Sequence, residues 1–476
     1  MGALQWFEIF IGAYVLWVLV ACATLLLDRG SPTATLAWIF AFIAIPFVSG
    51  IYYLMFGPRR LQRRRRRYTA ARGSVARGIA DDEEGAARPS LSPDAAGLAA
   101  VARRLEQGEP TFASAVKLLD NGDECMAALE EKFRESTHHI HLEYYIWEPD
   151  RVGTYFRDLL AEAARRGVEV RVLYDGMGSP KVNDRFWAPL REAGAEVIEF
   201  NPVRIWRITF GNFRTHRKIA ICDGLTGFLG GINMHDPASA TRSGKNAWRD
   251  QHSRIDGEPV HRLQRLFLEN WFYSGGTLRL GAASSAKYFP PARIGKGIAL
   301  QVIASGPDET TAPLHAFYLT AISAACERIL IETPYLIPDE PLESALRIAD
   351  LRGVKVQIIV PREGDSKLVT AASHTYCESL RKAGIDVFEY GPPMLHAKTM
   401  VVDETVAIIG TANLDNRSFR LNFEVAAAFY DKPLIARLVK RFEEDREASR
   451  PFRSRRKSEK MAVLFESIAR LTSPVL

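Results

Sequence analysis

The chain has 476 residues, of which 47% are hydrophobic and 25% charged, and its formal net charge at pH 7 is +6. This length exceeds what one hydrophobic core normally organises, so we expect two or more domains. Seven arginines lie between positions 59 and 67, and taking their charge from the total of +6 leaves −1 for the rest. A near-neutral body lacks the distributed basic surface that polyanion binding needs, which argues against nucleic acid as a partner.

The first 58 residues are the most apolar part of the chain and predict a two-helix transmembrane hairpin. Residues 9–27 contain no charge and would form a helix about 28 Å long, close to the roughly 30 Å of a hydrocarbon core. After a polar turn at 28–32, a second apolar run extends to Phe56. A cleaved signal peptide is the alternative for the first run, but no basic segment precedes it and a second run follows at once.

The arginine cluster that follows the hairpin predicts its orientation. By the positive-inside rule the cluster stays in the cytoplasm, so everything downstream is expected to face the cytoplasm too. Direct binding of anionic lipid headgroups is the alternative role. Residues 69–110 are rich in Ala, Arg, Gly, Asp and Glu. The whole segment 59–110 is therefore predicted to be an arginine-rich, flexible linker with some helical character.

From about residue 111 the sequence repeats itself. Each copy alternates V/I-rich strands with helical segments, which predicts an α/β layered sheet in each half. A break rich in Gly, Ala, Ser and Pro at about 275–298 separates the copies. The matching pairs are IHLEYYIWEPD (140–150) and ILIETPYLIPDE (329–340), ARRGVEVRVLYD (164–175) and DLRGVKVQIIVP (350–361), and LREAGAEVIEF (190–200) and LRKAGIDVFEY (380–390).

We therefore predict one domain at 111–285, a second at 295–450, and an amphipathic C-terminal tail at 451–476. Two segments have apolar or aromatic side chains that could meet a bilayer. RIWRITFGNF at 204–213 either dips into the interface or supports the strand that follows it. MAVLFESIARL at 461–471 has helical apolar spacing and docks either on the body or on lipid.

Each half then carries a copy of the pattern H-x-K-x4-D: HRKIAICD at 216–223 and HAKTMVVD at 396–403. GGIN at 230–233 and GTAN at 410–413 follow them. Side chains two apart on a strand point the same way, so His and Lys of each copy share one face. One isolated copy would more often be structural. Two copies with matching downstream turns indicate a single composite active site built by duplication.

The residue types in this composite site favour an anion over a metal. Lys218 and Lys398 would repel a cation, and the five widely spaced cysteines, without a C-x-x-C, indicate neither a zinc site nor a disulfide framework. The two lysines, with Asn233 and Asn413, would supply donors to the non-bridging oxygens of a phosphodiester. No metal and no cofactor is expected.

The two histidines can divide the chemistry. One, neutral, attacks phosphorus and forms a phosphohistidine, while the other protonates the leaving alkoxide and later takes a proton from the incoming alcohol. Each needs a carboxylate on its other ring nitrogen. We expect Glu424 to orient His396, which is 28 residues earlier, and Asp250 to orient His216. A surface or structural carboxylate is the alternative for Glu424.

Asp223 and Asp403 complete the two catalytic motifs. They lie five residues beyond their lysines, at the expected end of the strand. We expect them to hold the turn by hydrogen bonds and ion pairs more than to take part in the chemistry.

Together these motifs resemble the phospholipase D superfamily, and more narrowly the bacterial cardiolipin synthases. The resemblance covers nearly the whole chain and includes SGPD at 305–308 and GTANLDNRSFRLNFE after the second motif. It implies two tandem phospholipase D-like α/β sandwich domains related by a pseudo-two-fold axis. It also implies that His216 is the nucleophile and His396 the general acid and base. Arg417 and Ser418 fall in the family's RSF segment, which implies a part in phosphate binding.

The activity that this resemblance implies is the joining of two phosphatidylglycerols into cardiolipin with release of glycerol, without a metal, by a multi-pass protein of the bacterial inner membrane. Phosphatidylglycerol and other membrane phospholipids are the implied partners. A lipid-hydrolysing phospholipase D is the alternative within the same chemistry. A nuclease of the superfamily fits the hairpin and the near-neutral body less well, and intact motifs argue against a scaffold with a decayed site.

One stretch departs from the family's pattern. After GGINM the family often has an acidic and aromatic pair, whereas this chain has HDPASATRSGKN. The role of His235 and of the loop around it is therefore left open, and the choice of donor or acceptor could differ there.

Overall fold

The structure, a computed structural model, describes residues 3–27, 32–45, 48–50, 53, 58–78, 88–202, 213–278, 280, 286–292, 295–309, 311–453, 464, 466–467 and 469–470. The chain divides into two compact units, Met1–Thr69 and Ala70–Leu476. Of the two segments that could meet a bilayer, all of 204–213 except Phe213 and most of 461–471 lie outside the described residues.

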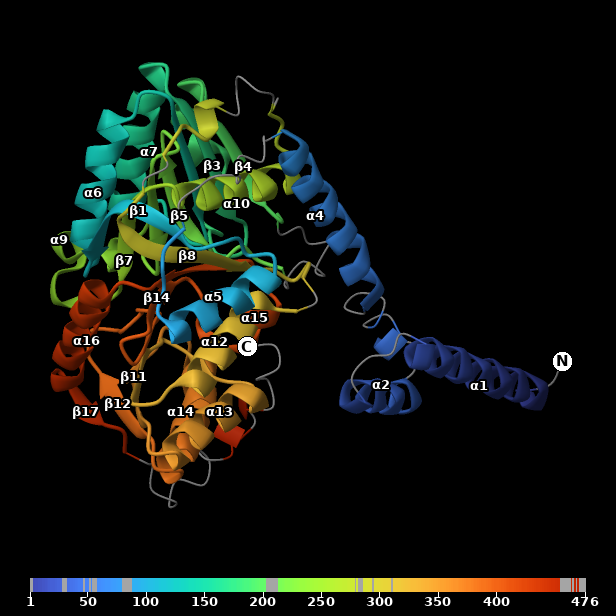
Figure 1. The fold of residues 1–476 in the computed structure, drawn as a ribbon. Helices are drawn as coiled ribbons and strands as arrows, with labels where there is room; N and C mark the ends of the chain where they lie inside the picture. The colour runs from blue at the N-terminus through green and yellow to red at the C-terminus, as the bar shows by residue number, and fades with distance from the viewer. Residues whose placement is uncertain are drawn as a thin grey trace. The chain divides into compact units, whose positions relative to one another are not determined.

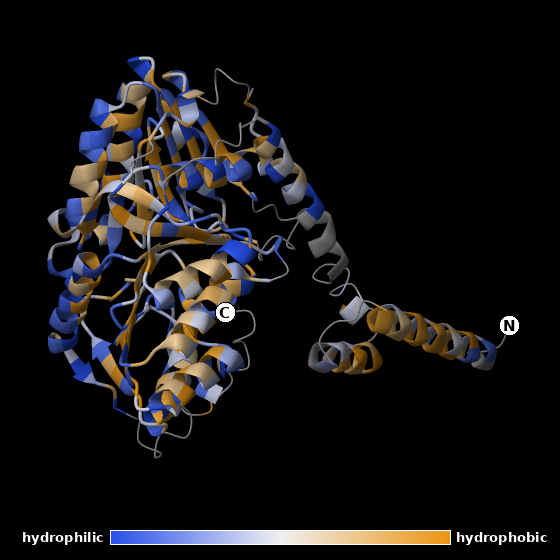
Figure 2. Ribbon diagram, viewed as in Figure 1, coloured by the Kyte–Doolittle hydropathy of each residue, from blue (hydrophilic) through white to orange (hydrophobic). Residues whose placement is uncertain are grey.

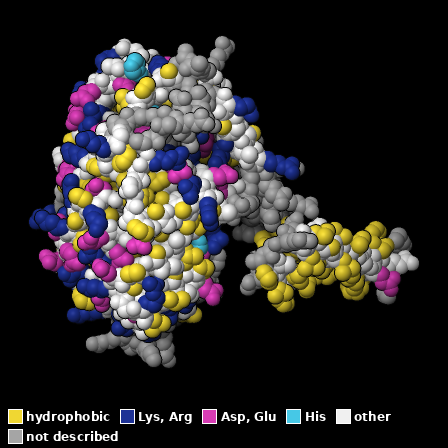
Figure 3. All heavy atoms as spheres, viewed as in Figure 1, with side chains coloured by type: hydrophobic (Ala, Val, Ile, Leu, Met, Phe, Trp, Pro, Cys, Tyr) yellow, Lys and Arg dark blue, Asp and Glu magenta, His cyan; other side chains and the backbone are white. Residues whose placement is uncertain are grey.

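The first unit contains two apolar helices, α1 (Ala3–Leu27) and α2 (Pro32–Ala44). They are hydrophobic around their whole circumference, and large apolar side chains cover their surface (Figures 2 and 3). Among the described residues, α1 alone is long and apolar enough to cross a membrane. The two helices pack together, with the Tyr14 hydroxyl donating to the Ile43 carbonyl over 2.7 Å. They can therefore form the predicted hairpin, in which α2 is the shorter arm.

The second unit repeats one order of elements twice, as the sequence predicts (Figure 1). The first half consists of β1 (Thr111–Leu119), α6 (Gly122–Glu135), β2 (His139–Tyr144), α7 (Arg151–Arg165), β3 (Glu169–Asp175), α8 (Asp184–Glu192), β4 (Glu196–Phe200), β5 (Lys218–Cys222), β6 (Thr226–Gly230), β7 (His252–Gly257) and α10 (Val260–Tyr273). Three short helical turns lie between β6 and β7, namely η2 (Asp236–Ala238), α9 (Ala240–Ser243) and η3 (Gly244–Asn246).

The second half repeats this order with a few short additions. It consists of β8 (Ile298–Ser305), α12 (Pro313–Ala324), β9 (Arg328–Glu332), β10 (Leu336–Ile337), α13 (Glu340–Leu351), β11 (Lys355–Pro361), α14 (Lys367–Lys382), β12 (Asp386–Tyr390), β13 (Thr399–Val402), β14 (Val406–Gly410), β15 (Leu414–Asp415), α15 (Asn416–Arg420), β16 (Glu424–Phe429), α16 (Lys432–Glu447) and β17 (Ser449–Pro451).

Fifteen of the described strands form one large sheet with a pseudo-two-fold relation at its centre, and β10 and β15 form a separate parallel pair. Its order is β17-β12-β11-β9-β13-β14-β16-β8-β1-β7-β6-β5-β2-β3-β4, so the sequence of equivalent strands is the same in both directions from the middle. The central pair, β1 and β8, is antiparallel and opposes Phe112 to Ala299. β6 contacts β14 although four strands separate them in this order, and the sheet is therefore curled. The predicted pseudo-symmetric α/β architecture is confirmed.

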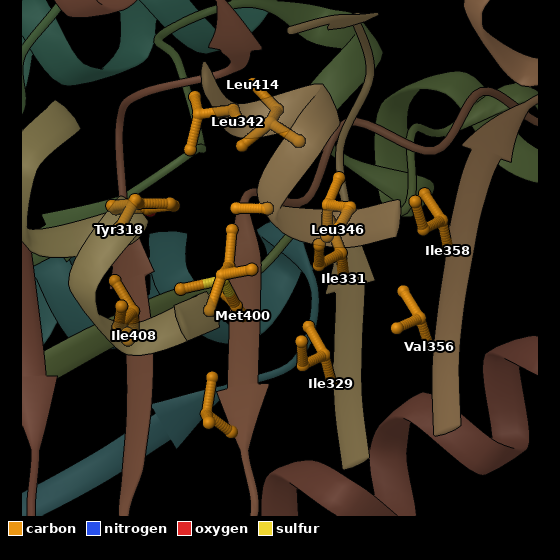
Figure 4. Packing of buried hydrophobic residues seen from close by; sticks show 14 of the residues in the cluster. Tyr318, Ile329, Ile331, Leu342, Leu346, Val356, Ile358, Met400, Ile408 and Leu414 are labelled. Carbon is orange, nitrogen blue, oxygen red and sulfur yellow. The ribbon is translucent and has the colours of Figure 1, made fainter. Parts of the chain in front are cut away.

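Helices cover both faces of the sheet in each half. In the second half, α12, α13 and α14 bury one face and α16 covers the other. Figure 4 shows this core, where Ile331 and Met400 of the sheet meet Leu346 of α13. In the first half, alternate residues of β2 divide in the same way: Leu142 joins the core under α6 and α7, and His141 stacks on Phe267 of α10.

Two segments near the ends of the body pack more closely than their composition indicates. For 59–110 we predicted a flexible linker with some helical character, and the described residues there include the helices α4 (Pro58–Gly78) and α5 (Pro93–Arg104). Leu98 and Ala102 of α5 join the core of the second half, because alanine-rich sequence favours helix and leaves a narrow apolar face. In the C-terminal tail, Ala469 is buried beside Ala372 of α14, so its described part docks on the body.

Candidate active site

The first catalytic pair lies where the chain enters β5. The Lys218 ammonium donates to the His216 carbonyl over 2.7 Å, and both side chains are buried. The His216 Nδ1 lies 3.0 Å from the carbonyl oxygen of Thr411 and 3.0 Å from Oε1 of Glu424. Because both partners only accept hydrogen bonds, Nδ1 carries the proton of the neutral ring. Nε2 then presents its lone pair, as a nucleophile needs.

The second pair repeats this arrangement where the chain enters β13. The Lys398 ammonium donates to the His396 carbonyl. The His396 Nδ1 lies 2.6 Å from Oδ2 of Asp250, so its Nε2 is also directed away from its carboxylate. The predicted H-x-K pairs therefore exist in both halves with the same local geometry.

The carboxylates are crossed between the halves, which corrects the predicted pairing. We expected Glu424 to orient His396 and Asp250 to orient His216, yet each histidine binds a carboxylate of the opposite half. Two short parallel bridges between the halves cause the exchange. The His216 N–H donates to the Phe423 carbonyl over 2.9 Å, and the His396 N–H donates to the Arg249 carbonyl over 2.7 Å. Each carboxylate is the next residue along the chain, and so it meets the histidine of the other half.

The two orienting carboxylates remain ionised although they are buried. Burial alone would raise the pKa of Glu424, but His216, Lys218 and the Thr411 hydroxyl hold it below its ordinary value. Burial would also raise the pKa of Asp250, but His396 and Lys398 outweigh this effect and hold the pKa below its ordinary value. Each histidine thus faces an anion on its Nδ1 side.

The histidines are neutral near pH 7. Burial lowers the pKa of His216 to about 4, although the Glu424 carboxylate opposes this shift. Burial and the neighbouring Lys398 ammonium also lower the pKa of His396. A ring that must act as an acid therefore gains its proton only when negative charge enters the site.

The two lysines, one from each half, are both buried and lie close enough for the charge of Lys398 to affect Lys218. Burial, together with the charge of Lys398, lowers the pKa of Lys218 to about 7. The pKa of Lys398 is lowered by burial to about 8, against the pull of Asp250 and Glu424. An anion bound between the ammonium groups would raise both values and stabilise both charges.

The two asparagines after the motifs differ in how their amides are used. The Asn233 Oδ1 accepts from the Ile146 N–H over 3.2 Å, and its buried Nδ2 has no partner among the described residues. The Asn413 Nδ2 donates to Asp415 over 3.2 Å. Asn233 therefore has both amide N–H groups available for a ligand, whereas one N–H group of Asn413 is used by Asp415.

The two aspartates of the motifs lie away from this site. Both follow their strands in the left-handed region, with φ of 55° for Asp223 and 51° for Asp403. Five residues of strand separate each from its lysine, about 16 Å. Their carboxylates accept from backbone N–H groups of Thr137, His138 and His139 in the first half and of Cys326, Glu327 and Arg328 in the second. Both aspartates therefore make hydrogen bonds at the turn, as we expected.

Ser418 has a local role in the turn after β14. Its hydroxyl accepts from the Asn413 N–H over 3.1 Å, and its own N–H donates to the Asp415 carboxylate over 2.7 Å. These bonds fix the start of α15. The Ser418 side chain is buried in this turn, and its part in phosphate binding stays a prediction. Arg417 lies close enough to influence the pKa of the Tyr145 hydroxyl.

Three residues that the sequence analysis did not select complete the site. The Tyr145 ring packs edge-on against His216 at 4.8 Å, with the Lys218 ammonium 5.3 Å from its centre. The Trp248 ring lies 5.0 Å from that of His396. The Thr411 hydroxyl donates to Glu424 over 2.5 Å. Tyr145 lies in the repeated HLEYYI stretch and Thr411 in GTAN, so the repeats themselves carried a signal for both.

Within the described part of the chain, no group of three or more His, Cys, Asp or Glu side chains is arranged to hold a metal ion. The groups that converge are two ammonium ions, two imidazoles and two carboxylates. This set is suited to binding an anionic phosphodiester between the lysines and to transferring protons at the histidines.

The comparisons with known proteins agree with this site. Both halves match the family described as "Cardiolipin synthase, PLD-like domain", over residues 129–271 and 318–446. The fold resembles a phosphatidylserine synthase from Haemophilus influenzae with a TM-score of 0.61 and 14% identity, covering 79% of this chain and 100% of that one. The fold and the repeated motifs thus define a protein of the phospholipase D class.

Similar sequences extend the match to nearly the full chain. A cardiolipin synthase from Geobacillus thermodenitrificans is 37% identical over 96% of this chain and 93% of its own length. Cardiolipin synthase 1 from Bacillus anthracis is 34% identical over 97% of this chain and 93% of its own. The chain belongs to the family of cardiolipin synthases with phospholipase D-like domains.

The crossed pairing makes a testable prediction about the two histidines. A carboxylate favours the imidazolium form, so Glu424→Gln should lower the pKa of His216 by about 1 or more and leave His396 unchanged. Asp250→Asn should do the same to His396 alone. Chemical shifts of isotopically labelled histidines followed against pH would measure this. Glu443→Gln, which removes a surface carboxylate of α16, should move neither, and a response of His396 to Glu424→Gln would refute the pairing.

Proposed function

We propose that the protein is a cardiolipin synthase, which transfers a phosphatidyl group from one phosphatidylglycerol to another and releases glycerol. The observation that carries this proposal is the pair of buried His–Lys motifs, one from each half, with crossed carboxylates. Membership of the cardiolipin synthase family supports the choice of lipid substrate.

In the proposed first step, His216 attacks phosphorus through Nε2. The new N–P bond forms while the bond from phosphorus to the glycerol oxygen breaks. His396, which gains a proton as the phosphodiester binds, donates it to the leaving glycerol oxygen. The lysines and the free amide of Asn233 stabilise the charge that builds on the non-bridging oxygens, where preorganised donors contribute most.

The second step reverses these roles with a different alcohol. A hydroxyl of a second phosphatidylglycerol gives its proton to His396 and attacks phosphorus, and the N–P bond to His216 breaks. The Glu424 carboxylate stabilises the imidazolium character of His216 as the ring gains and loses phosphorus. This assigns His216 as nucleophile and His396 as general acid and base, and it needs neither a metal nor a cofactor.

A membrane location fits a reaction between two lipids. We propose that α1 and the second apolar run, which begins with α2 and extends to Phe56, span the bacterial inner membrane as a hairpin, with both ends and the catalytic body on the cytoplasmic side. Tethering the body raises the effective concentration of lipid substrates and favours a lipid alcohol over water as acceptor. The proposed domains keep the predicted bounds, 111–285 and 295–450.

The reaction itself is tested with purified protein in phosphatidylglycerol micelles. Cardiolipin and glycerol should form in the presence of a chelator, and His216→Ala and His396→Ala should each abolish turnover. A covalent phosphatidyl group should be trapped on residue 216. Strict dependence on a divalent metal would contradict the mechanism, and a phosphoryl group on His396 of the active enzyme would reverse the assigned roles.

The separate roles of the carboxylates are tested with two leaving groups. A donor lipid that releases 4-nitrophenolate needs no proton from His396, so Asp250→Asn should slow its burst release only slightly. With phosphatidylglycerol the same variant should be slower by about 10² or more, the usual contribution of acid catalysis. Glu424→Gln should slow release from both donors, because it acts on the nucleophile. Equal effects of Asp250→Asn on both donors would contradict this division.

The orientation is tested with Cys326, which is exposed on the body. A membrane-impermeant maleimide should label Cys326 only after spheroplasts are permeabilised, because the body faces the cytoplasm. In a Cys326→Ser background, Ser31→Cys in the turn between the two apolar runs should be labelled in intact spheroplasts. Labelling of Cys326 from outside would refute the topology.

A further inference from the structure

The site departs from its two-fold relation in the turn that follows each GGIN or GTAN sequence. Asn233 and His235 occupy the places that Asn413 and Asp415 occupy in the second half. Asp415 accepts from the Asn413 amide over 3.2 Å and from the Ser418 N–H over 2.7 Å, so its carboxylate serves the turn. In the first half an imidazole replaces that carboxylate. The Asn413 Nδ2 thus has an acceptor within its own turn, whereas the Asn233 Nδ2 of the first half has no partner among the described residues.

The backbone on both sides of His235 is held in place. The Met234 N–H donates to the Ile146 carbonyl over 3.1 Å, and the Met234 carbonyl accepts from the Glu148 N–H over 3.0 Å. On the other side, the Asp236 N–H donates to Asp150 over 2.6 Å. The position of His235 is therefore fixed by the β2 end of the first half.

The ring of His235 lies beside the acid and base of the proposed reaction. It packs edge-on against Trp248 at 4.9 Å, and Trp248 packs against His396 at 5.0 Å. Only 5% of the surface of His235 is exposed to solvent. Neither ring nitrogen has a hydrogen-bond partner in the described portion of the chain.

His235 is also neutral in this setting. Burial, with His396 and Lys218 nearby, lowers its pKa to about 3. A neutral imidazole offers one N–H donor and one nitrogen acceptor. That combination matches a hydroxyl group, which both donates and accepts, better than it matches a phosphate oxygen, which only accepts.

We propose that His235 is a specificity-determining residue for the alcohol. When one hydroxyl of a polyol headgroup reacts at His396, His235 hydrogen-bonds a second hydroxyl of the same headgroup. The inference rests on the proposed function and deepens it by assigning the alcohol side of the site. Glycerol headgroups carry a hydroxyl next to the reacting oxygen, whereas water and simple alcohols do not. His235 therefore favours glycerol-type acceptors over water and over short monohydric alcohols.

The test is a competition for one phosphoenzyme. The full-length enzyme in phosphatidylglycerol micelles receives labelled glycerol and methanol together. Either alcohol forms the new O–P bond, the N–P bond to His216 breaks, and the alcohol's proton passes to His396. The ratio of labelled phosphatidylglycerol to phosphatidylmethanol then reports the preference. Because both products arise from the same intermediate, this ratio does not depend on how much of a variant is folded.

His235→Phe keeps an aromatic ring against Trp248 and removes both nitrogens. We expect it to lower the glycerol-to-methanol ratio about tenfold, the effect of losing one hydrogen bond of ordinary strength. His235→Gln, which restores a donor and an acceptor, should recover part of the ratio. His138→Phe, at an exposed histidine in the turn before β2, is the matched control and should keep the ratio of the unaltered enzyme.

The outcomes separate this inference from the function on which it rests. If the unaltered enzyme transfers to neither alcohol and makes no cardiolipin, the proposed function fails. If it transfers to both and His235→Phe leaves the ratio unchanged, the role of His235 is overturned while the function stands. Should His235→Phe give no active protein, the same ratio measured on His235→Leu decides, because this side chain also lacks both nitrogens and a ratio equal to that of His138→Phe would overturn the role of His235.

Discussion

The crossed hydrogen bonds between histidines and carboxylates are the constraint on which the site depends. The imidazole of His216 is oriented by Glu424 of the second half, and that of His396 by Asp250 of the first. Each bond fixes which nitrogen carries the proton and so directs Nε2 toward the space between the halves. Neither half contains a complete histidine–carboxylate pair. Separation of the halves would therefore leave each carboxylate without its imidazole and each imidazole without its carboxylate.

The same crossing creates a charge balance that suits an anion. Burial lowers the pKa of both lysines, and their mutual repulsion adds to the effect at Lys218. Gathering two ammonium groups in a buried place costs free energy that the carboxylates offset only in part. A phosphodiester supplies the missing negative charge where the lysines converge. It also raises the pKa of the neutral histidines, so binding prepares the acid that the reaction needs.

Duplication gave the site its symmetry, and a few substitutions remove part of it. Thr411 donates its hydroxyl to Glu424, whereas its counterpart Gly231 has no side chain, and a Cβ there would collide with Asp250. Asp415 accepts a hydrogen bond from Asn413 within the second turn, whereas its counterpart His235 makes no such bond among the described residues. Two chemically different roles for two equivalent histidines require such differences. The environment of each ring, and not its motif, separates nucleophile from acid.

The sequence by itself determined the α/β repeat, the apolar N-terminal runs and the two His–Lys pairs. These features depend on contiguous residues, whose periodicity and spacing are local properties. Side chains two apart on a strand share a face whatever surrounds them, which is why the pairing of His216 with Lys218 could be predicted.

The tertiary structure alone decided which carboxylate meets which histidine, and it reversed our expectation. Glu424 lies 208 residues from His216, and Asp250 lies 146 residues from His396. Proximity along the chain favoured the opposite pairing. Contacts over such separations are set by how the sheet curls and where short bridges join the halves, and no local pattern encodes that. The packing of α5 into the second half's core was hidden for the same reason, because an alanine-rich helix shows its buried face only against a partner.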